Sequence, residues 1–283
     1  MSTQITTAFV QEFKSGIDHL VQQDDSRLRN AVTIESVGPG KQAFFDQLGA
    51  TAMTERTTRH ADTAYTDTPH GRRMVPLRDY DVADLIDDPD KIRVLNDPTN
   101  AYSQAMAMAA MRNIDDVIIA AALGTAATGE TGSGSATATA AIVNDVDITT
   151  AIMAQVKRTM DEDEVPDSDR HIIMPASQFE ELLTDAQFQS SDFNSIKALV
   201  RGEVNTWLGF EFHRSERLET DGSSKKCFAW HKSGIKLAIG KDTTGRIDVL
   251  PTKRYSTQVF YSHTIGSVRM EEEKVVRLDL LTA

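Results

Sequence analysis

The chain lacks several features that mark secreted, disulfide-stabilised or membrane-embedded proteins. It has 283 residues but a single cysteine, Cys227, so no disulfide can form within it. No apolar run approaches the roughly 18 residues of a membrane helix, and the N-terminal MSTQITTAFVQEF lacks the basic and apolar regions of a secretory signal. We therefore expect a globular protein that folds in a reducing compartment, with no membrane partner.

Positive charge is also scarce. The chain carries 30 lysines and arginines against 42 aspartates and glutamates, which gives a formal net charge of −12. A protein that grips the phosphates of a nucleic acid normally presents a basic face. The acidic excess therefore argues against nucleic-acid binding as the main task, although it allows a wall that faces DNA without adhering to it.

No pattern typical of an active site or a cofactor site is present. Gly129–Ser135 resembles a phosphate-binding loop, but a serine stands where that loop needs lysine. The acidic run of residues 161–169 lacks the central glycine and terminal glutamate of a calcium loop. We predict no catalytic, cofactor or metal site and no enzymatic activity. The histidines lack metal-ligand spacing: His19, His60, His70, His171, His213, His231 and His263.

One long helix is predicted over residues 98–123. Asp97 is a good N-cap, Pro98 suits the first helical position, and neither proline nor glycine interrupts the run before Gly124. We expect the backbone to turn left-handed at Gly124 and Arg112 to pair with Asp116. An apolar stripe is predicted at Ala107, Met111, Ile114, Ile118, Ala121 and Ala122, with Gln104, Arg112, Asp115 and Asp116 mostly opposite.

The segments before this helix contain few apolar residues. Residues 1–50 are interpreted as an arm with an amphipathic helix over 6–23 and a short strand at VTIE; an ordinary N-terminal subdomain is the alternative. Residues 51–80 predict a long two-stranded hairpin, too polar for a core of its own. Such a hairpin suggests a partner subunit, although a solvated hairpin remains open. We predict subunit contacts at Arg56, Arg59, Asp62, Asp67, Arg72, Arg73 and Arg78.

The second half of the chain predicts a compact α/β unit followed by strands. After a flexible loop or loose hairpin around residues 124–141, a helix capped by Asp147 leads to a buried strand at 171–174. A short helix over 176–185, a strand at 210–214 and segments CFAWH and IKLAIG follow. Residues from 246 onward alternate as strands do, and Glu271–Lys274 is predicted to end a hairpin.

The order of these parts resembles the major capsid protein of tailed bacteriophages, which has the Hong Kong-type shell fold of class α+β. Three segments carry the resemblance: RRMVPLRDYDVADLIDDPD with the helix ending IIAAALGTAATGETG, LVRGEVNTWLGFEFHRSERL, and GSVRMEEEKVVRLDL. The resemblance implies an N-terminal arm (1–50), an extended loop (51–80), a peripheral domain (81–145) with its spine helix at 98–123, an axial domain (146–250), and C-terminal strands of the peripheral domain (251–283).

The resemblance also implies a function and partners. The chain is expected to form pentamers and hexamers of an icosahedral head around double-stranded DNA, in a virion assembled in the host cytoplasm. Portal and cement proteins are further expected partners, and the 50 residues before the loop leave scaffolding to a separate chain. Because no lysine lies between Lys41 and Lys91, we expect no covalent cross-link through the loop. Alternatives are an encapsulin-like shell and an α+β enzyme with an unrecognised site.

Overall fold

The computed structural model describes residues 22–60, 62–63, 65–87, 99–137, 141–143, 145–184 and 206–281. Residues 1–21, which carry most of the predicted N-terminal helix, and Asp97 and Pro98, predicted to begin the long helix, lie outside these residues. The chain divides into unit 1, made of residues 1–26, 79–113 and 242–263, and unit 2, made of residues 27–78, 114–241 and 264–283. Each unit is described by itself.

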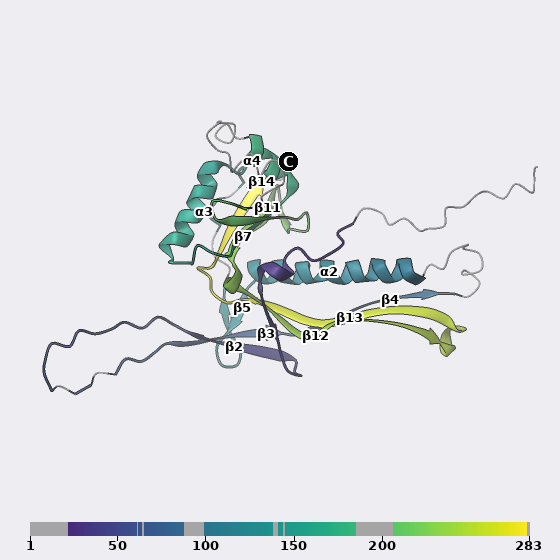
Figure 1. Cartoon of the computed structure of the whole chain (residues 1–283), viewed down its shortest axis with the longest axis horizontal. Coiled ribbons are helices and arrows are strands. Elements are labelled where there is room, and N and C mark those ends of the chain that lie inside the picture. The colour runs from purple at the N-terminus through teal and green to yellow at the C-terminus, as the bar shows by residue number, and fades with distance from the viewer. Residues whose placement is uncertain are drawn as a thin grey trace, which may run out of the picture. The chain divides into compact units, whose positions relative to one another are not determined.

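The long helix α2 (Thr99–Leu123) has 25 residues and ends where the sequence predicts (Figure 1). Its buried side chains recur at helical spacing, but three members of the predicted stripe are only partly buried, namely Ala107, Met111 and Ala121. The residues of the helix that are buried are Met106, Ala110, Ile114, Asp115, Ile118, Ile119 and Ala122. The prediction that Asp115 faces away from the core is therefore wrong.

The buried carboxylate of Asp115 has a structural role. It accepts hydrogen bonds from the backbone N–H groups of Arg27 and Leu28, each at 3.1 Å. These bonds compensate for its removal from water, which would strongly disfavour an unpaired carboxylate. The predicted pair of Arg112 with Asp116 is also not formed: Arg112 donates to Gln22, and Asp116 binds Arg217.

Gly124 does not turn left-handed as predicted. Its N–H group still donates to Ala120 O at 2.9 Å, which continues the helical pattern. A Cβ atom at this position would lie 2.6 Å from the same oxygen. The glycine therefore permits close backbone approach at the helix end, and the left-handed turns of this region fall on Gly129 and Gly132, between two later strands.

The first sheet contains four strands in the order β1, β12, β13, β4. They are β1 (Thr33–Ser36), β12 (Ile235–Leu250), β13 (Ser256–Arg269) and β4 (Arg78–Ile86). β1 is parallel to β12, with Thr33 opposite Lys236. In unit 1, Ile86, Met106 and Val259 form an apolar core between strands and helix, with Val82 and Tyr261 against it.

The second sheet belongs to unit 2 and has six strands. Its order is β10, β11, β7, β9, β8, and β14 pairs with β11. The strands are β7 (Arg170–Met174), β8 (Thr206–Trp207), β9 (Phe210–Arg214), β10 (Thr220–Asp221), β11 (Ser224–His231) and β14 (Val275–Leu281). The sequence predicted that β14 belongs to the peripheral sheet, whereas Trp230 of β11 lies opposite Val275 of β14. β13 and β14 therefore lie in different sheets, and residues 271–274 do not end a hairpin.

Two helices lie beside this second sheet (Figure 1). Helix α3 (Thr150–Glu162) buries Met153, Val156 and Met160. Its N-cap is Thr149, whose hydroxyl accepts from Ile152 N, and not the predicted Asp147. Helix α4 (Ala176–Thr184) places Phe179 edge-on against Phe212, with ring centroids 5.4 Å apart. The predicted α/β unit is thus present, but three of its six strands, β8, β10 and β14, were not predicted for it, and the predicted segment IKLAIG lies in β12 of the first sheet.

The third sheet has the order β2, β3, β5, β6 and also belongs to unit 2. Its strands are β2 (Gln42–Leu48), β3 (His70–Pro76), β5 (Ala126–Thr128) and β6 (Gly134–Ala136). One face buries Ala43, Phe45 and Val75 against Ala126, Val268 and Met270. The strands β5 and β6 form the loose hairpin that was one of the two predictions for residues 124–141.

Candidate assembly surface

The hairpin of β2 and β3 is the base of the candidate site. The two strands are antiparallel, with Asp46 opposite Arg72 and Phe45 opposite Arg73. Because side chains alternate across a strand, Phe45 and Arg73 share the buried face, and Asp46 and Arg72 share the other face. A hairpin is therefore present as predicted, but its paired strands begin earlier and the predicted pairing within residues 51–69 is absent from the described part of the chain.

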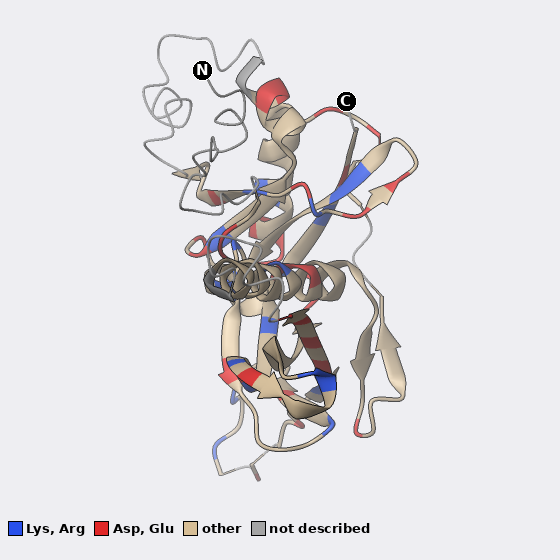
Figure 2. Cartoon of the chain, turned by 90° about the vertical axis from the view of Figure 1, so that its right-hand side faces the viewer, with Lys and Arg blue, Asp and Glu red and all other residues tan. Residues whose placement is uncertain are grey.

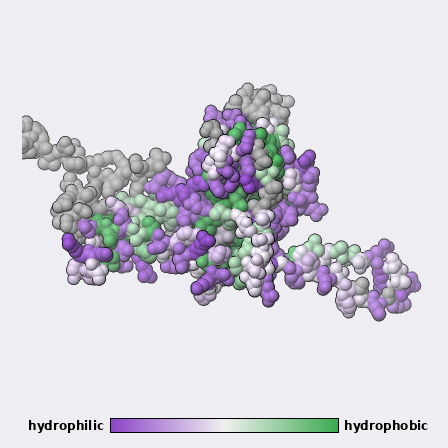
Figure 3. Space-filling view, turned by 180° about the vertical axis from the view of Figure 1, so that it is seen from behind, coloured by the Kyte–Doolittle hydropathy of each residue, from purple (hydrophilic) through white to green (hydrophobic). Residues whose placement is uncertain are grey.

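Residues 49–69 connect the two strands (Figure 1). They cover most of the extended loop that was predicted at 51–80, and from here on the name extended loop refers to residues 49–69. Every described residue in it is exposed, including the large apolar side chains of Met53 and Tyr65 at 101% and 94%. Gly49 N donates to Pro69 O at 2.8 Å and closes the base of the loop. In the space-filling view the extended loop carries no compact hydrophobic cluster (Figure 3). The described part of the loop therefore buries no side chain against its own chain.

The predicted contact residues fall into two groups. Arg56, Arg59, Asp62 and Asp67 lie exposed on the extended loop, and Arg78 is exposed at the start of β4. Arg72 and Arg73 lie on β3 instead, where both already have partners within the chain. The structure therefore does not bring the seven residues together as one site, and each of the seven contacts stays a prediction.

Arg72 forms a surface ion pair across the hairpin. Its Nε lies 2.6 Å from Asp46 Oδ1, and its guanidinium lies 5.7 Å from the centroid of the Phe44 ring. The hydrogen bond from Arg72 lowers the pKa of Asp46 below its ordinary value of 3.8. Because both side chains are exposed, such a pair contributes little stability by itself.

Arg73 fixes the base of the hairpin from the buried side. Its Nε donates to Met270 O at 2.8 Å, and its Nη2 lies 2.6 Å from Glu272 Oε2. Arg269, which is fully buried, donates to Ala122 O and Gly124 O at 2.8 Å and so caps the end of α2. Burial lowers the pKa of Arg269. These bonds anchor the extended loop to the core of unit 2.

Charges of both signs are interspersed along the described ribbon, without a large region of one sign (Figure 2). The acidic run after α3 illustrates this, because the buried Arg170 pairs with Asp161 at 2.7 Å and with Asp167 at 3.3 Å. The acidic residues of this run are all exposed, whereas Arg170 is 1% exposed. A hollow of about 940 Å³ opens beside the hairpin, lined in part by Leu48, Arg72 and Glu130.

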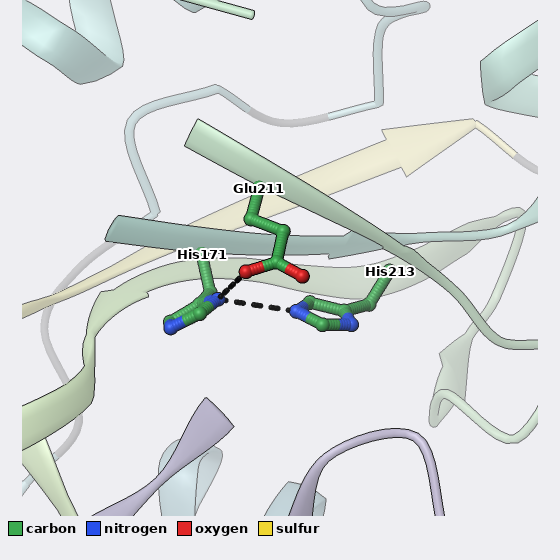
Figure 4. Close-up of side chains that lie close together, drawn as sticks. All are labelled: His171, Glu211 and His213. Carbon is green, nitrogen blue, oxygen red and sulfur yellow. Dashed lines mark hydrogen bonds and ion pairs between the residues drawn. The ribbon is translucent and has the colours of Figure 1, made fainter. Parts of the chain in front are cut away.

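One cluster of metal-ligating types of side chain was not predicted from the sequence. His171 of β7 lies beside Glu211 and His213 of β9, although 42 residues separate the two histidines (Figure 4). The available signal was local: Glu211 and His213 are two residues apart on a strand and therefore share a face. Only the pairing of β7 with β9 brings His171 to them.

The architecture defines the class of the protein. A long helix packed on long strands, a separate six-stranded sheet with two helices, and an extended loop without a core together form the Hong Kong-type shell fold. The chain belongs to the family described as phage capsid protein, whose model matches residues 5–281. It is accordingly a capsid shell protein of the α+β class, as the sequence predicted.

Solved capsids share this fold at low sequence identity. A cyanophage P-SCSP1u capsid structure matches with a TM-score of 0.77 and 15% identity, covering 100% of this chain and 96% of that chain. The capsid of Helicobacter pylori bacteriophage KHP30 gives a TM-score of 0.75 and 10% identity, covering 99% and 98%. The capsid of Ralstonia phage GP4 gives a TM-score of 0.73 and 10% identity, covering 97% and 96%. A search of curated proteins finds no match.

No helix in the described part of the chain has the length and apolar character needed to cross a membrane.

Proposed function

We propose that this chain is the major subunit of an icosahedral head of a tailed, double-stranded DNA bacteriophage. In this proposal it assembles into pentamers and hexamers in the host cytoplasm, without catalytic activity, and becomes part of the virion. Separate scaffolding, portal and cement proteins are further partners in this proposal. Membership of the phage capsid family supports the structural role, and the geometry of the extended loop supports the mode of assembly.

The single observation that carries the proposal is the exposure of the extended loop. Holding a residue in one conformation costs about 1–2 kcal/mol of backbone entropy, which burial or hydrogen bonding must offset. The described residues of the loop, 49–60, 62–63 and 65–69, obtain no such burial within the chain. We therefore infer that a neighbouring subunit supplies the surface on which the extended loop becomes ordered.

The charges of the loop indicate how that contact is made. Arg56 and Arg59 are exposed, and the chain has an excess of carboxylates, with a net charge of −12. Arginine forms two-pronged hydrogen bonds with carboxylates, and these become stronger when water is excluded by an interface. In the proposal, Arg56 and Arg59 bind carboxylates of the next subunit, and the hollow beside the hairpin receives side chains of another copy.

The acidic character also suits the proposed contents of the shell. A net charge of −12, with both signs interspersed along the described part of the ribbon, disfavours tight binding of DNA phosphates (Figure 2). DNA would then be enclosed without sequence-specific binding, and most of the binding energy would lie between subunits. The selective contacts are therefore those of the protein–protein interfaces.

The test compares two double variants of the exposed arginines. Arg56→Glu with Arg59→Glu reverses the charge, whereas Arg56→Lys with Arg59→Lys keeps it. Purified proteins, with and without co-expressed scaffold, are examined by negative-stain electron microscopy and sedimentation. We expect closed shells from the wild-type chain, fewer than about a tenth as many from the reversal variant, and shells from the lysine variant, since reversed charges repel across an interface.

Arg72 and Arg73 are unsuitable for this test because their ion pairs with Asp46 and Glu272 lie within the chain. Circular dichroism must show that the reversal variant folds, so that a loss of assembly cannot be attributed to a loss of stability. Normal shells from that variant would contradict the proposed arginine contacts. A wild-type chain that stays monomeric under every condition would contradict the shell assembly itself, and a small shell of fixed diameter would favour the encapsulin-like alternative.

A further inference from the structure

Three side chains of the six-stranded sheet converge at one point. β7 and β9 are parallel, with His171 opposite Glu211 and Ile173 opposite His213. Residues in register on neighbouring strands share a face, so the side chains of His171, Glu211 and His213 project from the same side of the sheet. Figure 4 shows the two rings and the carboxylate turned toward one another.

The distances within this cluster are those of ligands around one small cation. His171 Nδ1 lies 3.2 Å from His213 Nε2 and 3.3 Å from Glu211 Oε2. All three ligand atoms lie within 4.8 Å of one another. A zinc ion with bonds of about 2.0–2.1 Å and tetrahedral angles separates its ligand atoms by about 3.3 Å. Two of the three distances between ligand atoms therefore match a tetrahedral site without movement of the strands.

The chemistry of the three groups suits a divalent transition metal. Two imidazole nitrogens and one carboxylate oxygen are a ligand set that zinc uses in proteins. His171 is buried and His213 is half-buried, whereas the carboxylate-bearing side chain of Glu211 is 46% exposed. A cation could enter from the side of Glu211, and the fourth position would remain for water or another ligand.

Two further carboxylates lie near the cluster. Asp169 lies near His171, and Asp115 near His213, and both add negative charge around a bound cation.

We propose that His171, Glu211 and His213 form a binding site for a divalent transition metal of the zinc type. The metal would cross-link β7 to β9, two strands that are separated in sequence by residues 175–209. The inference is independent of the proposed function, because it concerns the stability of the six-stranded sheet and not the contacts between subunits. The first test is zinc binding to the untagged, unassembled full-length chain after treatment with a chelator.

Three variants make the test specific. Glu211→Gln and His213→Gln each remove one ligand and keep the size of the side chain. His70→Gln is the matched control, since His70 is an exposed histidine on β3. Isothermal titration with zinc should show one ion for each wild-type chain, the same for the control, and affinity at least about tenfold lower for either ligand variant.

Two further measurements distinguish a specific zinc site from non-specific zinc binding. Zinc at a hundredfold excess over its dissociation constant should raise the melting temperature of the unassembled chain by about 5 °C or more, and it should not do so in the ligand variants. Cobalt(II) in the same site should give the visible absorption of tetrahedral coordination. Circular dichroism checks that both ligand variants fold before zinc is added.

The zinc-binding measurements can either support or overturn the proposed metal site. One bound ion that both ligand variants lose and the control keeps supports the site. Zinc binding of equal strength in all four proteins, or no saturable binding to the wild-type chain at micromolar zinc, overturns it. In that case the three side chains form only a hydrogen-bonded cluster around the contact of His171 with His213.

Discussion

The six-stranded sheet and the extended loop are opposite kinds of structure within unit 2. Every residue of β7 is buried, and its neighbour β11 buries Phe228 and Trp230 completely. In the extended loop, by contrast, every described residue is exposed. The sheet thus gains its stability from contacts inside the chain, whereas the loop has to gain it from contacts outside.

The contrast explains how a shell subunit can be both stable and ready to assemble. A sheet with helices beside it buries its apolar residues within one chain and can fold before any partner arrives. A long exposed loop costs little to the folded subunit, because loops tolerate length and exposure. Ordering the loop costs conformational entropy, and this cost arises only when the loop docks on a partner. Mutations should therefore separate folding from assembly, according to the region they change.

The largest expected effect comes from the core of the sheet. Phe228→Ala removes a fully buried ring that packs 4.9 Å from the ring of Trp230. The free energy of unfolding should fall by about 3–5 kcal/mol, since a cavity remains in place of the ring. Met53→Ala in the extended loop is the matched large-to-small change, and it should alter that free energy by less than about 0.5 kcal/mol.

Urea unfolding of the unassembled chain, followed by circular dichroism, measures both effects. Similar losses in the two variants would mean that Met53 has a partner within the chain, and the comparison of the two regions would fail.

A smaller effect is expected where the hairpin meets β13. A Cβ atom on Gly266 would lie 2.5 Å from Pro76 O and 2.7 Å from Val75 Cγ1. Gly266→Ala should therefore lower the free energy of unfolding by about 1–3 kcal/mol, because backbone atoms have to move. Gly38→Ala is the control, since a Cβ atom at Gly38 would have no neighbouring atom within 4 Å. That change should be neutral or slightly stabilising.

Denaturant midpoints of these two variants give the answer. If both glycine variants unfold at the wild-type midpoint, the close approach of β13 to β3 is not a constraint on the anchoring of the extended loop.

For a single pH unit, the smallest effect is a difference in pH dependence. His171 has a pKa of about 4 in the folded chain against about 6.5 when unfolded, because burial disfavours its charged form. Between these values the unfolded chain binds the extra proton, so stability falls as the pH drops from 6.5 toward 4, by at most about 1.4 kcal/mol per pH unit. Nearby His213, Lys232 and His231 also lower the pKa of His171, whereas Asp169 opposes them.

The hairpin should respond in a different range. Arg72 lowers the pKa of Asp46 below 3.8, so the contribution of this pair is present above that pH and is lost only in stronger acid. Unfolding measured with a chelator present at pH 7, 6, 5 and 4 tests the prediction. His171→Gln should flatten the dependence, and His70→Gln should not. An unchanged slope in His171→Gln would show that other groups cause it.

Several elements of the fold could be read from local patterns. The helix α2 is an uninterrupted run between a proline and a glycine, and its observed end agrees with the pattern. The strand β7 is a short apolar run stopped by Pro175, and it is fully buried as expected. Such predictions succeed because proline, glycine and hydrophobic spacing act on residues close together in the chain.

Other features depended on partners that no local pattern names. Asp115 looks like a surface residue on a helical wheel, but Arg27 and Leu28 supply the N–H groups that allow its burial. The sequence did not indicate that Arg73 is buried and bound within its own chain by Met270 O and Glu272. A charged residue can be buried wherever distant segments provide the matching charge or hydrogen bond.

Sequence patterns and the order of the parts were enough to predict the class of fold, the long helix, the flanking strands and a polar segment without a core. The folded chain was needed to see that β14 joins the six-stranded sheet and that His171 meets Glu211 and His213. The two kinds of feature differ in the range of the interactions that cause them. Secondary structure follows from neighbours a few residues apart, whereas strand pairing and converging ligands follow from which distant segments pack together, and that is set by the whole chain at once.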